Sequence, residues 1–144
     1  MLKIVTFQSH EYQKLLELRN TVLRIPLGMD IYDDPLYEEI HDIHFGYFEK
    51  DQVIGTLILR DLGNKIFKMR QVAVLESARG NGIGQEMVIF SERYAQEKGG
   101  KQMELNARNT AVSFYEKLGY QKEGDAFLEV SIIHYKMIKK LNRL

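Results

Sequence analysis

The chain has 144 residues, a length that suits one domain with its own hydrophobic core. Its 20 Lys and Arg residues balance its 20 Asp and Glu residues, so the charge excludes nucleic-acid binding through a broad positive surface. Cysteine is absent, which excludes disulfides and a thiol nucleophile, and the four histidines lack metal-ligand spacing, so we expect no metal.

The N-terminal third predicts a strand at 2–7 and then a helix. Ser9 can cap that helix, whose apolar positions are Tyr12, Leu15, Leu16 and Val22. The next segment, 24–43, is irregular and holds both prolines and a group of acids, namely Asp30, Asp33, Asp34, Glu38, Glu39 and Asp42. These acids could attract a cationic substrate, although a solvated loop is the simpler interpretation.

The rest of the chain alternates between strand and helix patterns. A hairpin is predicted at 44–49 and 53–60, and a third strand at 65–74. A helix at 84–98, a strand at 102–106, a helix at 110–118 and two strands near 120–124 and 131–139 follow. Asn109 or Thr110 is the expected cap of the second of these helices. This order predicts a single domain of the mixed α/β (α+β) class.

The turn after the third strand is rich in glycine. It contains Arg79, Gly80, Gly82 and Gly84, and a helix with an apolar face begins there. A helix start offers unpaired N–H groups and a positive dipole end, and glycine lets a ligand approach the backbone closely. The turn is therefore suited to binding a phosphate group.

The glycine spacing discriminates among phosphate-binding loops. A dinucleotide fingerprint would need glycine where the chain has Gln85 or Met87, and a P-loop would need Lys-Ser/Thr after Gly84. The remaining pattern, Arg79-x-x-Gly82-x-Gly84, resembles the coenzyme A pyrophosphate loop of the GNAT superfamily of acyltransferases.

A second stretch strengthens this resemblance. Residues 111–120 read Ala-Val-Ser-Phe-Tyr-Glu-Lys-Leu-Gly-Tyr, which is similar to the second GNAT signature. Its helix carries a tyrosine, here Tyr115, near the thioester sulfur in the family. The segment from Phe127 to Met137 also resembles the closing hairpin of one GNAT branch, and the resemblance covers roughly residues 44–140.

The resemblance implies a mostly antiparallel central sheet that is splayed at the cofactor site and flanked by helices. It implies that acetyl-coenzyme A donates an acetyl group to a small-molecule or peptide amine, with Tyr115 as the general acid. The implied cofactor-binding residues are Val72, Ala73, Val74, Arg79, Gly80, Asn81, Gly82, Ile83, Gly84, Gln85, Asn106, Asn109 and Phe114. The family asparagine is replaced by Arg108, so either Asn106 or Asn109 could face the cofactor.

Several points stay open at this level. The family's strand for a catalytic carboxylate offers Arg70 and Gln71, which leaves Glu129, His134, His44 and Glu104 as candidate bases, each with a structural role as the simpler interpretation. A non-catalytic acyl-coenzyme A sensor and a nucleotide-binding regulatory domain are alternative functions. The absence of a signal peptide or membrane-length apolar run leads us to expect a cytoplasmic protein without membrane or nucleic-acid partners. The sequence leaves a homodimer open.

Overall fold

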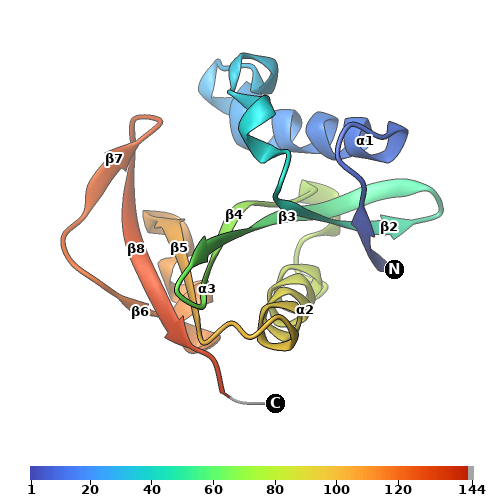
Figure 1. The fold of residues 1–144 in the computed structure, drawn as a ribbon. Coiled ribbons are helices and arrows are strands. Elements are labelled where there is room, and N and C mark those ends of the chain that lie inside the picture. Colours follow the sequence, from blue (N-terminus) through green and yellow to red (C-terminus); the bar gives the residue numbers. More distant parts are fainter. Residues whose placement is uncertain (143–144) are drawn as a thin grey trace. The chain divides into compact units, whose positions relative to one another are not determined.

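The computed structural model describes residues 1–142, which form two compact units. The first unit contains Met1–Arg60 and Gln71–Phe90, and the second contains Asp61–Arg70 and the chain from Ser91 onward. The strand order is β1-β2-β3-β4-β5-β8-β6, and β7 pairs with β8 (Figure 1). The pairings β1–β2, β2–β3, β5–β8, β6–β8 and β7–β8 are antiparallel and β4–β5 is parallel, so the mixed, mostly antiparallel α/β class is confirmed.

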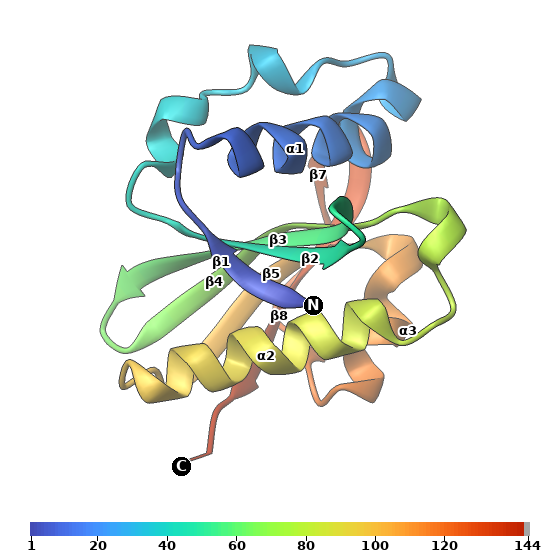
Figure 2. The ribbon, with the colours of Figure 1, turned by 90° about the vertical axis from the view of Figure 1, so that its right-hand side faces the viewer.

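In the first unit the strands β1 (Leu2–Val5), β2 (Ile43–Glu49) and β3 (Gln52–Gly63) form an antiparallel meander. Helix α1 (His10–Arg19) lies on one face of these strands, and the first turns of α2 (Ile83–Glu97) lie on the other (Figures 1 and 2). Two glycines make room for this packing. A Cβ on Gly46 would lie 2.9 Å from Leu15 of α1, and one on Gly55 would lie 2.9 Å from Met87 of α2.

Local signals in the sequence explain the ends of α1. The Ser9 hydroxyl accepts a hydrogen bond from the Tyr12 N–H at 3.1 Å, as predicted for a cap. The helix continues as a π-helical turn, Asn20–Arg24, which includes the predicted Val22. The irregular segment that follows contains three 3₁₀ turns, Ile25–Leu27, Ile31–Asp33 and Leu36–Glu39.

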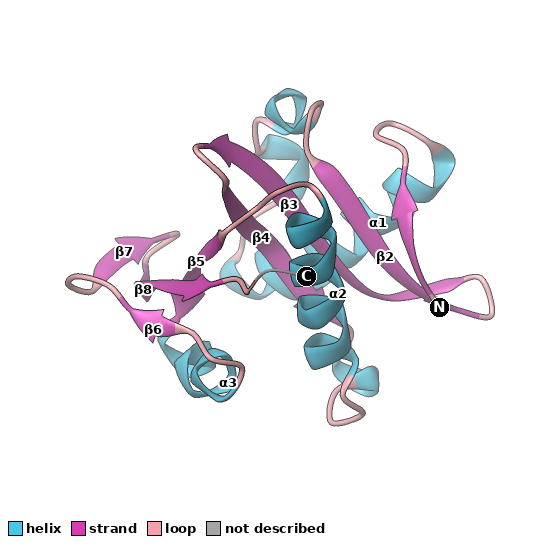
Figure 3. Cartoon of the chain, turned by 60° about the horizontal axis from the view of Figure 1, so that its bottom comes forward, coloured by secondary structure: helices cyan, strands magenta, loops and turns pink. Residues whose placement is uncertain are grey.

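The second unit is built on β5 (Gln102–Arg108) and β8 (Ile132–Lys140), which pair antiparallel along their lengths. The start of β4 (Ile66–Val74) runs parallel to β5. Figure 3 shows two short strands along β8: β6 (Gln121–Lys122) pairs near one end and β7 (Phe127–Glu129) near the other. The strand pattern alone predicted only two strands after residue 119, because β7 has too few residues to show a period. The resemblance of Phe127–Met137 to a closing hairpin did imply a strand there, and β7 pairs with β8.

The expected cap of the last helix is wrong. Helix α3 spans only Val112–Lys117, and a 3₁₀ turn, Asn109–Ala111, precedes it. Its N-cap is Ala111, which has no side chain that could cap, so neither Asn109 nor Thr110 takes that role. The end of the helix is as expected, because Gly119 adopts a φ of 98° just beyond it.

A charged network is buried in the first unit. Arg19, 1% exposed, donates to both carboxylate oxygens of Glu39 at 2.8 and 2.7 Å. The Tyr12 hydroxyl donates to the same carboxylate at 2.8 Å, and the His44 Nε2–H donates to the Glu39 carbonyl oxygen at 3.1 Å. Burial alone would raise the pKa of Glu39, but the hydrogen bonds and charge of Arg19 outweigh burial and lower it. The network therefore holds a charged carboxylate inside the core.

Candidate functional site

The loop between β4 and α2 has the geometry of an anion cradle. After a 3₁₀ turn at Glu76–Ala78, Gly80 and Gly82 adopt φ values of 84° and 76°, which side chains rarely take. A Cβ added at either glycine would meet nothing within 4 Å, so the space beside the backbone is open. The loop ends at the first turn of α2, where Gln85 and Glu86 are exposed, and the first N–H groups of a helix have no partner inside the helix. Such a nest can hold a phosphate group.

Two side-chain hydrogen bonds to backbone carbonyl groups stabilise this loop. The Arg79 Nε–H donates to the Val74 carbonyl oxygen at 3.2 Å, which ties the arginine back to the end of β4 while its side chain stays exposed. The Asn81 Nδ2–H donates to the Ala78 carbonyl oxygen at 3.3 Å. Ile83 is buried and anchors the start of α2, whereas Gln85 is exposed and Gly84 is half-buried. The structure therefore brings together Val74 and residues 79–85 of the predicted set.

The end of β4 carries a strained residue that the sequence did not reveal. Gln71 has a φ of 54°, in the left-handed region, and its Oε1 is buried without a partner among the described residues. The pairing of β4 with β5 covers Ile66–Met69 and ends before Gln71. Val72, Ala73 and Val74 follow this paired stretch, and backbone groups outside a ladder can serve a ligand.

Tyr115 lies in the second unit and is 7% exposed. Its ring packs edge-on against Phe114 at 5.0 Å and Tyr120 at 5.8 Å between centroids. Burial raises the pKa of its phenol to about 12, so the hydroxyl stays protonated at neutral pH. Phe114 itself is 37% exposed. The phenol is thus a protonated donor in an apolar setting.

The two candidate asparagines differ in their surroundings. The Asn106 Nδ2–H donates to Glu129 Oε1 at 3.3 Å, whereas Asn109 is exposed in the 3₁₀ turn before α3. Glu129 Oε2 in turn lies 3.5 Å from His134 Nε2. The structure therefore brings together Asn106 and two of the four candidate bases.

The other two candidate bases have structural partners. His44 belongs to the buried network in the first unit, and burial lowers its pKa despite the opposing hydrogen bond to Glu39. Glu104 lies 3.6 Å from the Lys136 ammonium, which also pairs with Glu123 at 3.1 Å. A structural role is therefore the simpler interpretation of both His44 and Glu104.

Half of the acids in the segment 24–43 pair with arginines. The pairs are Arg19–Glu39, Arg24–Asp34 and Arg60–Asp42, and Asp30 caps a 3₁₀ turn through the Tyr32 N–H. These pairs remove half of the negative charge that could attract a cation, which favours the interpretation of a structured surface segment.

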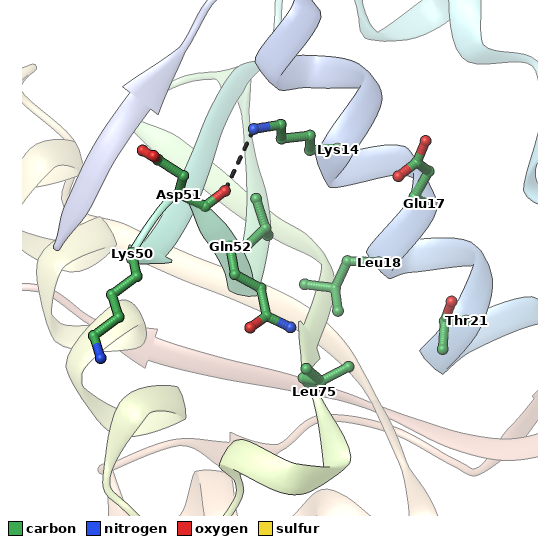
Figure 4. A pocket seen from close by; sticks show the side chains of 9 residues that line it. Lys14, Glu17, Leu18, Thr21, Lys50, Asp51, Gln52 and Leu75 are labelled. Carbon is green, nitrogen blue, oxygen red and sulfur yellow. Dashed lines mark hydrogen bonds between the residues drawn. The ribbon is translucent and has the colours of Figure 1, made fainter.

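The first unit also contains an open hollow of about 460 Å³ (Figure 4). It lies between α1 and the turn from β2 to β3, where the Lys14 ammonium donates to the Asp51 carbonyl oxygen at 3.3 Å. Its lining mixes Lys14 and Lys50 with Glu17 and Asp51, so its charge selects no ligand class. Within residues 1–142, no cluster of three or more metal-ligating side chains occurs, and no helix has the length and apolarity to cross a bilayer.

Comparison with known proteins agrees with this geometry. A sequence profile of the acetyltransferase (GNAT) domain matches residues 26–141. Among curated proteins, YyaT of Bacillus subtilis is 32% identical over 110 residues (76% of this chain and 72% of YyaT). The N-acetyltransferase YjcF of the same organism, itself uncharacterised, is 30% identical over 111 residues (73% of this chain and 79% of YjcF).

Solved structures share the fold. An aminoglycoside 6'-N-acetyltransferase complexed with coenzyme A superposes with a TM-score of 0.83 at 17% identity (100% of this chain and 98% of the other covered). ElaA of Escherichia coli superposes with a TM-score of 0.84 at 18% identity (96% of this chain and 99% of ElaA covered). At such identities the likeness concerns the fold alone.

Proposed function

The chain belongs to the acetyltransferase (GNAT) domain family, and from this premise we propose that it transfers an acetyl group from acetyl-coenzyme A to a primary amine. The observation that carries the proposal is the open, glycine-lined loop at the start of α2, braced by Arg79. Because the chain has no cysteine to carry the acyl group, the amine attacks the thioester directly in a ternary complex.

Each part of the cofactor has a proposed partner. The pyrophosphate binds the N–H groups of Gly80–Gly84 and the guanidinium of Arg79 through charge-assisted hydrogen bonds. The pantetheine amides pair with the backbone of Val72–Val74, and backbone N–H groups near Gln71 stabilise the oxyanion. Tyr115 donates to the departing sulfur. The cytoplasmic location expected from the sequence stays a prediction.

Ligand-dependent melting and turnover together test the proposal. Coenzyme A and acetyl-coenzyme A at a hundredfold excess over Kd should raise Tm by about 5–10 °C, because they bind only the folded chain. ATP and NAD should have little effect. Acetyl transfer is then measured with spermidine, kanamycin and lysine amide as amines. Melting shifts without any transfer would favour a sensor, and equal shifts with ATP or NAD would contradict the coenzyme A assignment.

A substitution in the loop tests the pyrophosphate site. We expect Gly82→Val to weaken coenzyme A binding by about 5–150-fold, equivalent to about 1–3 kcal/mol of backbone strain and blocked approach. Isothermal titration calorimetry of the folded variant measures this change. Gly63→Val is the matched control, because Gly63 also has a positive φ of 83° and no neighbour within 4 Å, but is the last residue of β3, away from this loop in the sequence. Unchanged affinity in Gly82→Val would contradict the assignment.

A further inference from the structure

The hairpin of β7 and β8 carries a carboxylate–imidazole pair that no part of the proposed cofactor site uses. Glu129, at the end of β7, has a side chain 49% exposed, while the His134 side chain on β8 is only 4% exposed. Glu129 Oε2 lies 3.5 Å from His134 Nε2, and Glu129 Oε1 accepts a hydrogen bond from Asn106 on β5 at 3.3 Å. Two neighbouring strands thus hold the two oxygens of one half-exposed carboxylate.

The orientation of the His134 ring is fixed. Its Nδ1 lies 2.8 Å from the Ile132 carbonyl oxygen, and a carbonyl only accepts, so Nδ1 carries the proton. Phe127 stacks on the ring at 6.0 Å with an interplanar angle of 26°. In the neutral ring, therefore, Nε2 is the bare nitrogen, and it is the one that faces the Glu129 carboxylate.

The charges around the pair decide how it can act. The Glu129 carboxylate faces His134 Nε2, and Arg108 is the register partner of His134 on β5. Lys136, the register partner of Asn106, lies near Glu104 and Glu123, so carboxylates offset its charge. Glu104 and Glu123 already pair with Lys136, whereas the exposed carboxylate of Glu129 can receive a cation.

We propose that Glu129 and His134 form the proton relay for the acceptor amine, with Glu129 binding the ammonium and His134 Nε2 taking the proton. This inference rests on the proposed function. The ammonium N–H bond breaks, the proton passes by way of the Glu129 carboxylate to Nε2, and the freed lone pair of nitrogen attacks the thioester carbonyl. The carboxylate then stabilises the imidazolium until it releases the proton to water. The 3.5 Å distance between Glu129 Oε2 and His134 Nε2 shortens when the bound ammonium moves the carboxylate.

Glu129→Gln tests the relay, and Glu123→Gln is its control because the Glu123 side chain is equally exposed, at 50%. With spermidine, kanamycin and lysine amide, Glu129→Gln should lower kcat by about 100-fold, the low end for a general base, without changing the KM for acetyl-coenzyme A. The loss should shrink as the pH rises, because the amine then arrives deprotonated. Glu123→Gln should stay within about twofold of the wild type. A Glu129→Gln enzyme with more than half the wild-type kcat, or a loss equal at every pH, overturns the relay.

A readout without turnover separates the relay from the proposed function. If the wild type acetylates none of the three amines, that result contradicts the proposed function. The ¹⁵N NMR spectrum of the His134 ring at neutral pH then tests the relay itself. A proton on Nδ1 with a bare Nε2 supports it, whereas a proton on Nε2 leaves that nitrogen unable to accept another and overturns it.

Discussion

Tyr115→Phe is expected to lower the single-turnover rate of acetyl transfer by about 10²–10⁴-fold, equivalent to about 3–5 kcal/mol of barrier. Phenylalanine keeps the ring and its packing against Phe114 and Tyr120 and removes only the hydroxyl. Coenzyme A affinity, measured by calorimetry, should be nearly unchanged. A raised KM with an intact rate would instead mean that the hydroxyl made a ground-state contact.

The surroundings of Tyr115 refine its expected role. With its pKa raised to about 12, the phenol is a weaker acid than an ordinary thiol, whose pKa is about 8.5. Complete transfer of its proton to a thiolate is therefore unfavourable. A hydrogen bond to the sulfur as negative charge develops needs no complete transfer and still lowers the barrier. If the variant keeps more than about half of the wild-type single-turnover rate, Tyr115 is only a packed helix residue.

Glu39→Gln is expected to destabilise the fold by about 3–5 kcal/mol, because it leaves the Arg19 guanidinium buried without its counter-charge. Urea unfolding at pH 7 measures the loss. Glu11→Gln is the control: it removes one half of the Lys3–Glu11 pair, whose side chains are 39% and 40% exposed, and should cost less than about 1 kcal/mol. Equal effects of the two substitutions would contradict a stabilising role for the buried network.

The same network predicts the acid sensitivity of the wild type. Since the pKa of Glu39 is lowered in the fold, its contribution is present above the unfolded value and is lost as the pH falls through the folded value. The pKa of His44 is also lowered, so the unfolded chain takes up a proton first, and stability declines from about pH 6.5 downward. Glu39→Gln should flatten only the more acidic part of this profile in urea unfolding.

Much of the site could be predicted from short stretches of sequence. The glycines at 80 and 82 adopt the positive φ angles that their spacing implied, and they precede α2 as expected. Ser9 caps α1, and Gly119 ends α3. These features depend on contacts within one or two turns of chain, where the missing Cβ of glycine or a nearby hydroxyl decides the conformation.

The amino-acid sequence by itself predicted most of the order of strands and helices and the family, and it led to the proposal that the loop at 79–84 binds a phosphate group. Only the tertiary structure decided which polar residues meet. The ion pairs of the acidic segment and the Asn106–Glu129–His134 cluster join residues from separate elements. The left-handed conformation of Gln71 is likewise visible only in the folded chain. No local sequence pattern predicts these contacts, because they depend on strand register and on burial, which outweigh local propensity in the folded chain. Local sequence features therefore predicted the cofactor loop, and the packed fold brought together the residues proposed to receive the acceptor.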